Sequence, residues 1–288
     1  MEEARVTLTQ INRTIAIALN NGNLPQKTES RRLRSTKGFL KMAALRDPGA
    51  TSPLTLCPNG HSIVECSHCS VRSLSVCSAL DADELAALDR LARHVGFEAR
   101  STLFEQDEMS DSVFNITAGS VRLYKLLPDG RRQIVGFALP GDFLGLSMSD
   151  RNAFSADAMT AVSACQFSRN AFSDLLDAKP HLLRRLHSMA SHELSLAQDQ
   201  MVILGRRTAE EKVAAFLMGL RKRWSRIDGS TVHVPLPMTR QDIGDFLGLT
   251  VETVSRMLTK LAREKALVIV PDGVRLLDVP RLEAMAAS

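Results

Sequence analysis

The feature of the sequence that most constrains the fold is residues 238–265, which read MTRQDIGDFLGLTVETVSRMLTKLAREK. Thr239 suits the N-cap of a first helix, with Asp242 three residues later as the partner of a capping box. Gly248 suits a tight turn, because glycine accepts a left-handed backbone without steric cost. Thr250 then suits the N-cap of a second helix. Two short helices joined in this way predict a helix-turn-helix, whose second helix enters the major groove of DNA.

The second helix is expected to have an apolar face and a polar face. The apolar residues recur at helical spacing and predict a stripe that packs on a core; they are Val251, Val254, Leu258 and Leu261. The polar face begins with side chains that bond to base edges, and cations that suit phosphates follow. The candidate DNA-binding residues are Thr250, Glu252, Ser255, Arg256, Thr259, Lys260 and Arg263.

The residues that follow strengthen this interpretation. Residues 266–279, ALVIVPDGVRLLDV, contain two apolar runs around the turn signal Pro271-Asp272-Gly273. An ordinary helical hairpin with a solvated charged face would explain the two helices alone. A helix-turn-helix followed by a small hairpin instead predicts a winged helix-turn-helix DNA-binding domain over residues 206–288.

Hydropathy and charge narrow the class of protein. The chain has no run of 18 apolar residues and its N-terminus is polar, so we expect neither a membrane span nor a secretory signal, and a cytoplasmic location. Residues 1–50 and 205–288 carry net charges of +5 and +4, whereas the part between carries −5. Basic charge at the DNA-binding end and a mildly acidic middle are typical of a regulator. Residues 1–56 lack a sustained apolar period, which predicts a disordered tail.

Residues 57–80 hold four of the five cysteines, in the stretch CPNGHSIVECSHCSVRSLSVC. In a cytosolic protein this crowding indicates a metal or redox site rather than disulfides. Three uses remain open from the spacing alone. The first is an iron–sulfur cluster. The second is zinc on Cys57, Cys66, Cys69 and Cys77, with His61 or His68 as substitutes. The third is a thioredoxin-like pair, although no βαβ pattern surrounds it. A stretch without a cofactor is the structural alternative.

The middle of the chain, residues 81–178, predicts an antiparallel β-roll. Short strands such as SVFNI, VRLYKL and QIVGFAL are separated by turn signals at Gly119, Pro128-Asp129-Gly130 and Pro140-Gly141-Asp142. Cys165 lies in a later strand, where a single cysteine is more often core than ligand.

Residues 179–205 predict one long helix with two apolar stripes. One stripe can rest on the roll and the other can pair with a second copy of the chain. A helix buried within a monomer is the alternative. Gly205 is expected to break the helix. The proposed dimer seam follows a heptad and comprises Leu183, His187, Ala190, Leu194, Ala197, Met201 and Leu204.

The whole is an α+β chain whose order of roll, long helix and winged helix resembles the CRP/FNR family of bacterial transcription regulators, over about residues 66–280. The roll of that family is of the cyclic-nucleotide-binding type. The sequence VETVSR, with Glu252, Ser255 and Arg256, is similar to the E-x-x-S-R signature of the FNR and FixK branch. The resemblance implies a homodimer that binds a TTGA…TCAA-type palindrome in double-stranded DNA. It also implies a mainly activating regulator, not an enzyme, with RNA polymerase as a partner.

The resemblance also implies an oxygen-labile 4Fe-4S cluster on Cys66, Cys69, Cys77 and Cys165, which leaves Cys57 as the spare. The interval between Cys69 and Cys77 is longer than in enteric FNR and similar to that of photosynthetic and nitrogen-fixing bacteria. Ala197 stands where the family often has an acidic residue in the dimer seam.

Cyclic AMP is not expected as an effector. Cyclic-nucleotide members carry an Arg-Ser pair after G-[DE]-x-x-G, and this chain has Phe154-Ser155 there, with Arg151 out of register. The alternatives to the cluster-based sensor are a FixK-like regulator that holds zinc or no metal, a haem sensor, and a thiol-redox enzyme.

Overall fold

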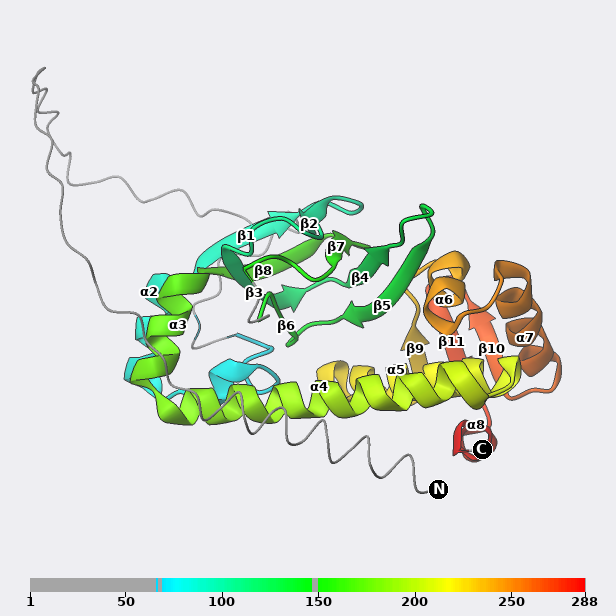
Figure 1. The fold of residues 1–288 in the computed structure, drawn as a ribbon. Coiled ribbons are helices and arrows are strands. Elements are labelled where there is room, and N and C mark those ends of the chain that lie inside the picture. Colours follow the sequence, from blue (N-terminus) through cyan, green and yellow to red (C-terminus); the bar gives the residue numbers. More distant parts are fainter. Residues whose placement is uncertain (1–65, 67–68, 147–149, 288) are drawn as a thin grey trace, which may run out of the picture. The chain divides into compact units, whose positions relative to one another are not determined.

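The structure, a computed structural model, describes residues 66, 69–146 and 150–287 (Figure 1). The expected tail over residues 1–56, and Cys57 with it, lie outside these residues. In the part of the chain that is described, no helix combines the length and the apolar character that a membrane span requires.

Two antiparallel four-stranded sheets form the roll that the sequence predicts. The first has the order β1-β8-β3-β6 and the second β2-β7-β4-β5. Apolar residues of both sheets, among them Ile116, Val121 and Val162, are completely or almost completely buried in one core between them. The strands are β1 (Arg93–Phe97), β2 (Thr102–Phe104), β3 (Ser112–Ala118), β4 (Val121–Leu126), β5 (Arg132–Ala138), β6 (Phe143–Leu144), β7 (Ser155–Ala158) and β8 (Val162–Ser168).

The outer face of the first sheet carries a second core. Alternation along β3 and β8 turns Val113, Cys165 and Phe167 away from the roll interior. Leu88 and Leu182 of the surrounding helices bury themselves against this face. The helices are the short 3₁₀ helix η2 (Val76–Ala79), α2 (Ala82–Leu91), α3 (Arg169–Ala178) and the first turns of α4 (Pro180–Arg206).

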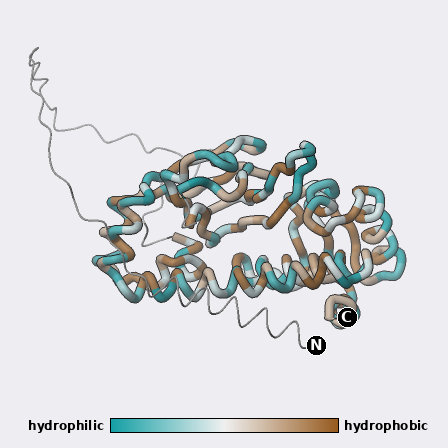
Figure 2. Tube along the Cα trace, in the orientation of Figure 1, coloured by the Kyte–Doolittle hydropathy of each residue, from teal (hydrophilic) through white to brown (hydrophobic). Residues whose placement is uncertain are grey.

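Helix α4 is continuous over 27 residues, and hydrophobic residues alternate with hydrophilic ones along it (Figure 2). The prediction that Gly205 breaks it is wrong, since Gly205 lies inside the last turn. A single glycine costs a helix about 1 kcal/mol, which is too little to end it where the flanking residues are helical. All seven residues of the proposed dimer seam are exposed, led by Met201 at 71% and Leu194 at 61%.

The C-terminal part is a winged helix-turn-helix with two elements that the sequence did not predict. Strand β9 adds a third strand to the expected hairpin, in the order β10-β11-β9, and α8 packs on α5. Capping boxes start α5 at Thr208 with Glu211 and α6 at Thr239 with Asp242. The elements are α5 (Ala209–Asp228), β9 (His233–Pro235), α6 (Arg240–Leu247), α7 (Val251–Arg263), β10 (Leu267–Val270), β11 (Gly273–Leu276) and α8 (Val279–Ala287).

Glu84 connects α2 to the start of α4. Its carboxylate completes the capping box of α2 with Asp81, and it pairs with Lys179 Nζ and His181 Nε2, each at 2.9 Å. The hydrogen bond from Lys179, followed by the Asp81 backbone amide and His181, lowers the pKa of Glu84 to about 2 despite partial desolvation. The carboxylate is therefore charged in the folded chain throughout the ordinary pH range.

We predict that Glu84→Gln destabilises the chain at neutral pH and that the difference becomes smaller at pH 3. Glutamine can still serve the capping box but cannot form the ion pairs. Because the folded pKa lies near 2, below the usual 4.5, the stabilisation is complete above pH about 4.5 and is lost as the pH falls through about 2. The measurement compares the urea unfolding midpoints of wild type and Glu84→Gln at several pH values between 7 and 3. Asp83→Asn, in the same helical turn, is the control. A difference that does not change with pH would contradict the assignment.

Candidate DNA-reading helices and cysteine site

The two helices α6 and α7 are held at their angle by the turn between them. Gly248 ends α6 in the left-handed conformation, at φ 63°, which a residue with a side chain adopts only at a cost. The Thr250 side chain accepts a hydrogen bond from Thr253 N at 3.2 Å and so caps α7. Gly244 in α6 faces the turn so closely that a Cβ atom there would lie 2.6 Å from Leu249 O. The local signals in the sequence therefore produced the predicted motif.

The structure confirms the amphipathic character of α7. Val254, Leu258 and Leu261 are fully buried, whereas Glu252, Arg256 and Thr259 are exposed and Ser255 is half-buried. The residues on this polar face line one open hollow, formed by Ser255, Arg256, Met257, Thr259, Lys260 and Arg263.

The polar face presents both an anion and cations. The amide of Glu252 at the helix N-terminus, followed by the Thr250 side chain, lowers the pKa of Glu252, so its carboxylate is an ionised acceptor at neutral pH. In the part of the chain that the structure describes, Arg256 has no carboxylate partner. Such a glutamate and such an arginine can pair with cytosine N4 and with guanine O6 and N7.

Lys260 differs from the free phosphate-binding cation that the sequence predicts. Its Nζ forms an ion pair with Glu210 of α5 and lies 3.9 Å from Glu264. The hydrogen bond with Glu210 raises the pKa of Lys260. A phosphate that contacts Lys260 must therefore displace the Glu210 carboxylate or share the lysine with it. Arg263, in contrast, is exposed.

Cysteines from distant parts of the chain meet in the second core. Cys77 of η2 and Cys165 of β8 are buried there at 7% and 6% exposure, and Cys66 packs against them. Cys66 interacts electrostatically with Cys165 and Cys77, and Cys77 with Cys69. Burial raises the pKa of the Cys66 and Cys77 thiols, so both are neutral without a metal.

Three polar residues that the sequence analysis missed adjoin these thiols. Cys66 Sγ donates to Asp89 Oδ1 at 3.0 Å, and His94 Nδ1 lies 3.8 Å from Cys165 Sγ. Asn115 stands directly opposite Cys165 in the β3–β8 pairing with 1% exposure, and its Oδ1 atom has no hydrogen-bond partner among the described residues. Only the strand register places His94 and Asn115 beside Cys165, and the sequence contains no signal that fixes that register.

The described residues contain no group of three or more histidine, cysteine, aspartate and glutamate side chains already spaced to hold one metal ion. The four cysteines are therefore gathered in one region without adopting the geometry of ligands.

A winged helix-turn-helix joined to a roll by a long helix defines a transcription regulator that binds DNA. Residues 211–285 match the Crp-like helix-turn-helix domain, and residues 94–179 match the cyclic nucleotide-binding domain. The transcriptional activatory protein AadR of Rhodopseudomonas palustris is 56% identical over 77% of this chain and 92% of its own length.

The nitrogen fixation regulation protein FixK of Bradyrhizobium diazoefficiens is 54% identical over 80% of this chain and 96% of its own length. The solved structure of FixK2 from Bradyrhizobium japonicum shares 36% identity and superposes with a TM-score of 0.64, over 68% of this chain and 98% of that one. The chain belongs to the CRP/FNR family, with regulators of the FixK type, and is not an enzyme.

We predict that Gly244→Ala destabilises the chain by about 1–3 kcal/mol, because the new methyl group would displace the turn carbonyl of Leu249. Gly219→Ala is the matched control. Gly219 is an exposed helical glycine with nothing within 4 Å of a Cβ atom, so alanine there should stabilise the chain by about 0.5–1 kcal/mol. Urea unfolding measures both, and equal effects would show that the close approach at Gly244 is unimportant.

Proposed function

We propose that the chain is a homodimeric activator that binds a TTGA…TCAA-type palindrome and responds to oxygen through a 4Fe-4S cluster on Cys66, Cys69, Cys77 and Cys165. The observation that carries the proposal is the gathering of the N-terminal cysteines around Cys165, which a strand of the roll contributes. RNA polymerase is the proposed partner on DNA. The FixK relatives are nitrogen fixation regulation proteins, and we extend that class of target genes to this chain.

The residues beside the cysteines suit an iron–sulfur cluster. Four thiols supply the usual ligand set. The amide of Asn115, whose Oδ1 atom has no hydrogen-bond partner in the part of the chain that is described, lies next to Cys165. Because the oxygen and nitrogen of an amide can exchange places, its NH2 group can turn toward the sulfur atoms, which accept hydrogen bonds. When bound, the cluster would supply a centre that oxygen oxidises and dismantles.

The path from the cysteines to the dimer seam is short. Helix η2, which carries Cys77, packs on α4, and Leu182 of α4 is fully buried in the same core as Cys77 and Cys165. Ligation would fix η2 and the preceding cysteines against the roll and so set the position of α4. The exposed heptad of α4, with Leu194 and Met201, would then pair with a second copy. Loss of the cluster would free the cysteines and η2, and α4 would then be held less firmly against the roll.

Cyclic AMP has no part in this proposal. By the resemblance to cyclic-nucleotide members, Phe154 stands where the phosphate-binding arginine is expected, and its ring lies 6.0 Å from that of Phe104. Arg151 donates instead to the carbonyl of Asp107.

The cluster is tested on protein purified without oxygen, by its absorption spectrum and by assays of iron, sulfide and zinc. We expect a visible band that bleaches in air, with about four irons and four sulfides per chain. Cys165→Ala should abolish these signals, whereas Cys57→Ala, the control, should preserve them.

The second candidate is a regulator without a cluster, which the lack of ready metal-ligand spacing in the described residues favours. It predicts one zinc per chain that survives Cys165→Ala, or no metal in any variant. Either result would remove the oxygen-sensing mechanism and leave the DNA-binding proposal intact.

Base readout by Arg256 is tested by measuring the affinity of Arg256→Ala for the palindrome and for single-base variants of it. We expect a loss of about 1–3 kcal/mol per half-site and relaxed choice at one base pair. Arg263→Ala is the control, because loss of a phosphate contact weakens all sequences about equally. If Arg256→Ala behaved like the control, its assignment to a base would be wrong.

A further inference from the structure

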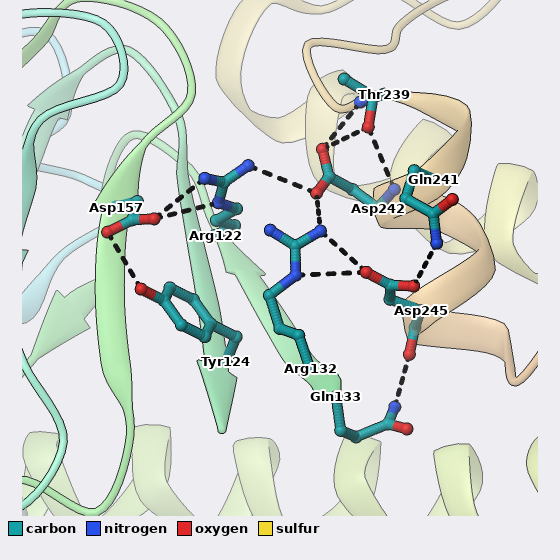
Figure 3. A network of polar contacts seen from close by, with 9 residues as sticks. All are labelled: Arg122, Tyr124, Arg132, Gln133, Asp157, Thr239, Gln241, Asp242 and Asp245. Atoms are coloured by element: carbon teal, nitrogen blue, oxygen red, sulfur yellow. Dashed lines mark hydrogen bonds and ion pairs between the residues drawn. The ribbon is translucent and has the colours of Figure 1, made fainter. Parts of the chain in front are cut away.

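Residues of the roll hold α6, the first helix of the helix-turn-helix, through a network of charges (Figure 3). Arg132 of β5 donates to Asp245 from Nε at 3.1 Å and from Nη2 at 2.7 Å. The same Nη2 lies 2.7 Å from Asp242 Oδ1. Arg122 of β4 contacts Asp242 at 3.4 Å and is itself fixed by Asp157 at 2.9 Å. The two domains are thus joined by arginines on one side and carboxylates on the other.

This network is shielded, unlike a surface ion pair. The Asp242 side chain is 2% exposed and those of Asp245 and Arg132 are 16% and 24% exposed. Burial disfavours the charge of Arg132, but the hydrogen bonds and charges of Asp245 and Asp242 outweigh it and raise the pKa of Arg132. Its sequence neighbour Arg131 is 78% exposed and, within the described residues, its side chain forms an ion pair with Asp129 of its own turn alone. The chain therefore offers a matched control one residue away.

Apolar packing beneath the network brings the same elements together. Phe137 of β5 lies against Phe246 of α6 and Phe216 of α5, at ring distances of 5.3 and 6.1 Å. Apolar contact holds surfaces together without a preferred direction. A guanidinium that bonds two carboxylates on one helix does fix a direction, because its donors form a rigid fork. Packing thus holds α6 close to the roll, and the fork of Arg132 on two carboxylates adds a constraint on its rotation.

The rotation of α6 determines that of the recognition helix α7. The contact of Gly244 with the turn at Leu249 leaves little freedom between the two helices. In a dimer, the orientation of each α7 relative to its own roll determines how far apart the two reading faces lie, and so which half-site spacing fits.

We propose that Arg132 is a positioning residue that sets the half-site spacing accepted by the dimer, by fixing α6 and hence α7 relative to the roll. This inference rests on the proposed binding of a palindrome by a homodimer. Arg132 reads no base itself. Its loss should widen the range of accepted spacings, because the weaker contacts of Arg122 with Asp242 and of Gln133 with Asp245 O would then be the remaining directional links between α6 and strands β4 and β5 among the described residues.

The experiment compares full-length wild type, Arg132→Ala and Arg131→Ala on duplexes whose half-sites are at the optimal spacing or one base pair closer or further apart. We expect wild type and Arg131→Ala to prefer the optimal spacing strongly. Arg132→Ala should reduce this preference at least about tenfold, the scale of effect when one partner of a shielded charge pair is removed. Arg132→Lys, which keeps the charge but not the fork, should recover part of it.

A merely structural role would weaken binding to all three duplexes equally, and an unchanged ratio in folded Arg132→Ala would overturn the inference. Asp245→Asn should also reduce the preference, and adding it to Arg132→Ala should produce less than the sum of the two effects, since the residues act as one pair. A wild type without any spacing preference would overturn the palindrome proposal itself. The two failures are therefore distinguishable.

Discussion

The last turn of α6 receives hydrogen bonds from three other parts of the structure. The final carbonyls of a helix have no partners within it and need donors from elsewhere. Gln133 of β5 donates to Asp245 O at 2.6 Å, Gln200 of α4 to Phe246 O at 3.1 Å, and Lys212 of α5 to Leu247 O at 3.3 Å. Three successive carbonyls of one short helix are thus satisfied by the roll, the long helix and the first helix of the DNA-binding domain. The helix-turn-helix is consequently bonded directly to the roll and to α4, in addition to its covalent connection through α5.

Helix α4 connects the two candidate sites by its two ends. Its first turns bury Leu182 in the core that holds Cys77 and Cys165, and Gln200 near its other end bonds to α6. Between these points its side chains are largely exposed. A shift of α4 would therefore change the packing around the cysteines, the position of α6 and the exposed face available to a second copy.

The parts of the fold that the sequence predicted are those governed by local physics. The capping box at Thr239, the turn at Gly248 and the two faces of α7 depend on residues within a few positions of one another. Strand β9, with three residues, is too short to show a period, and its place in the sheet comes from pairing with β11. The contact between Arg132 and Asp245 spans 113 positions and follows only from tertiary packing. The same holds for His94 and Asn115 beside Cys165.

The ion pair between Lys260 and Glu210 should affect how strongly the affinity for DNA depends on salt concentration. A basic residue that neutralises a DNA phosphate releases condensed counterions, which makes affinity fall steeply with salt. Lys260 begins with its charge already compensated by Glu210. When a phosphate takes the lysine, the vacated carboxylate collects a cation from solution and offsets part of that release. The affinity of this chain for DNA should therefore depend on salt less than its number of basic residues suggests.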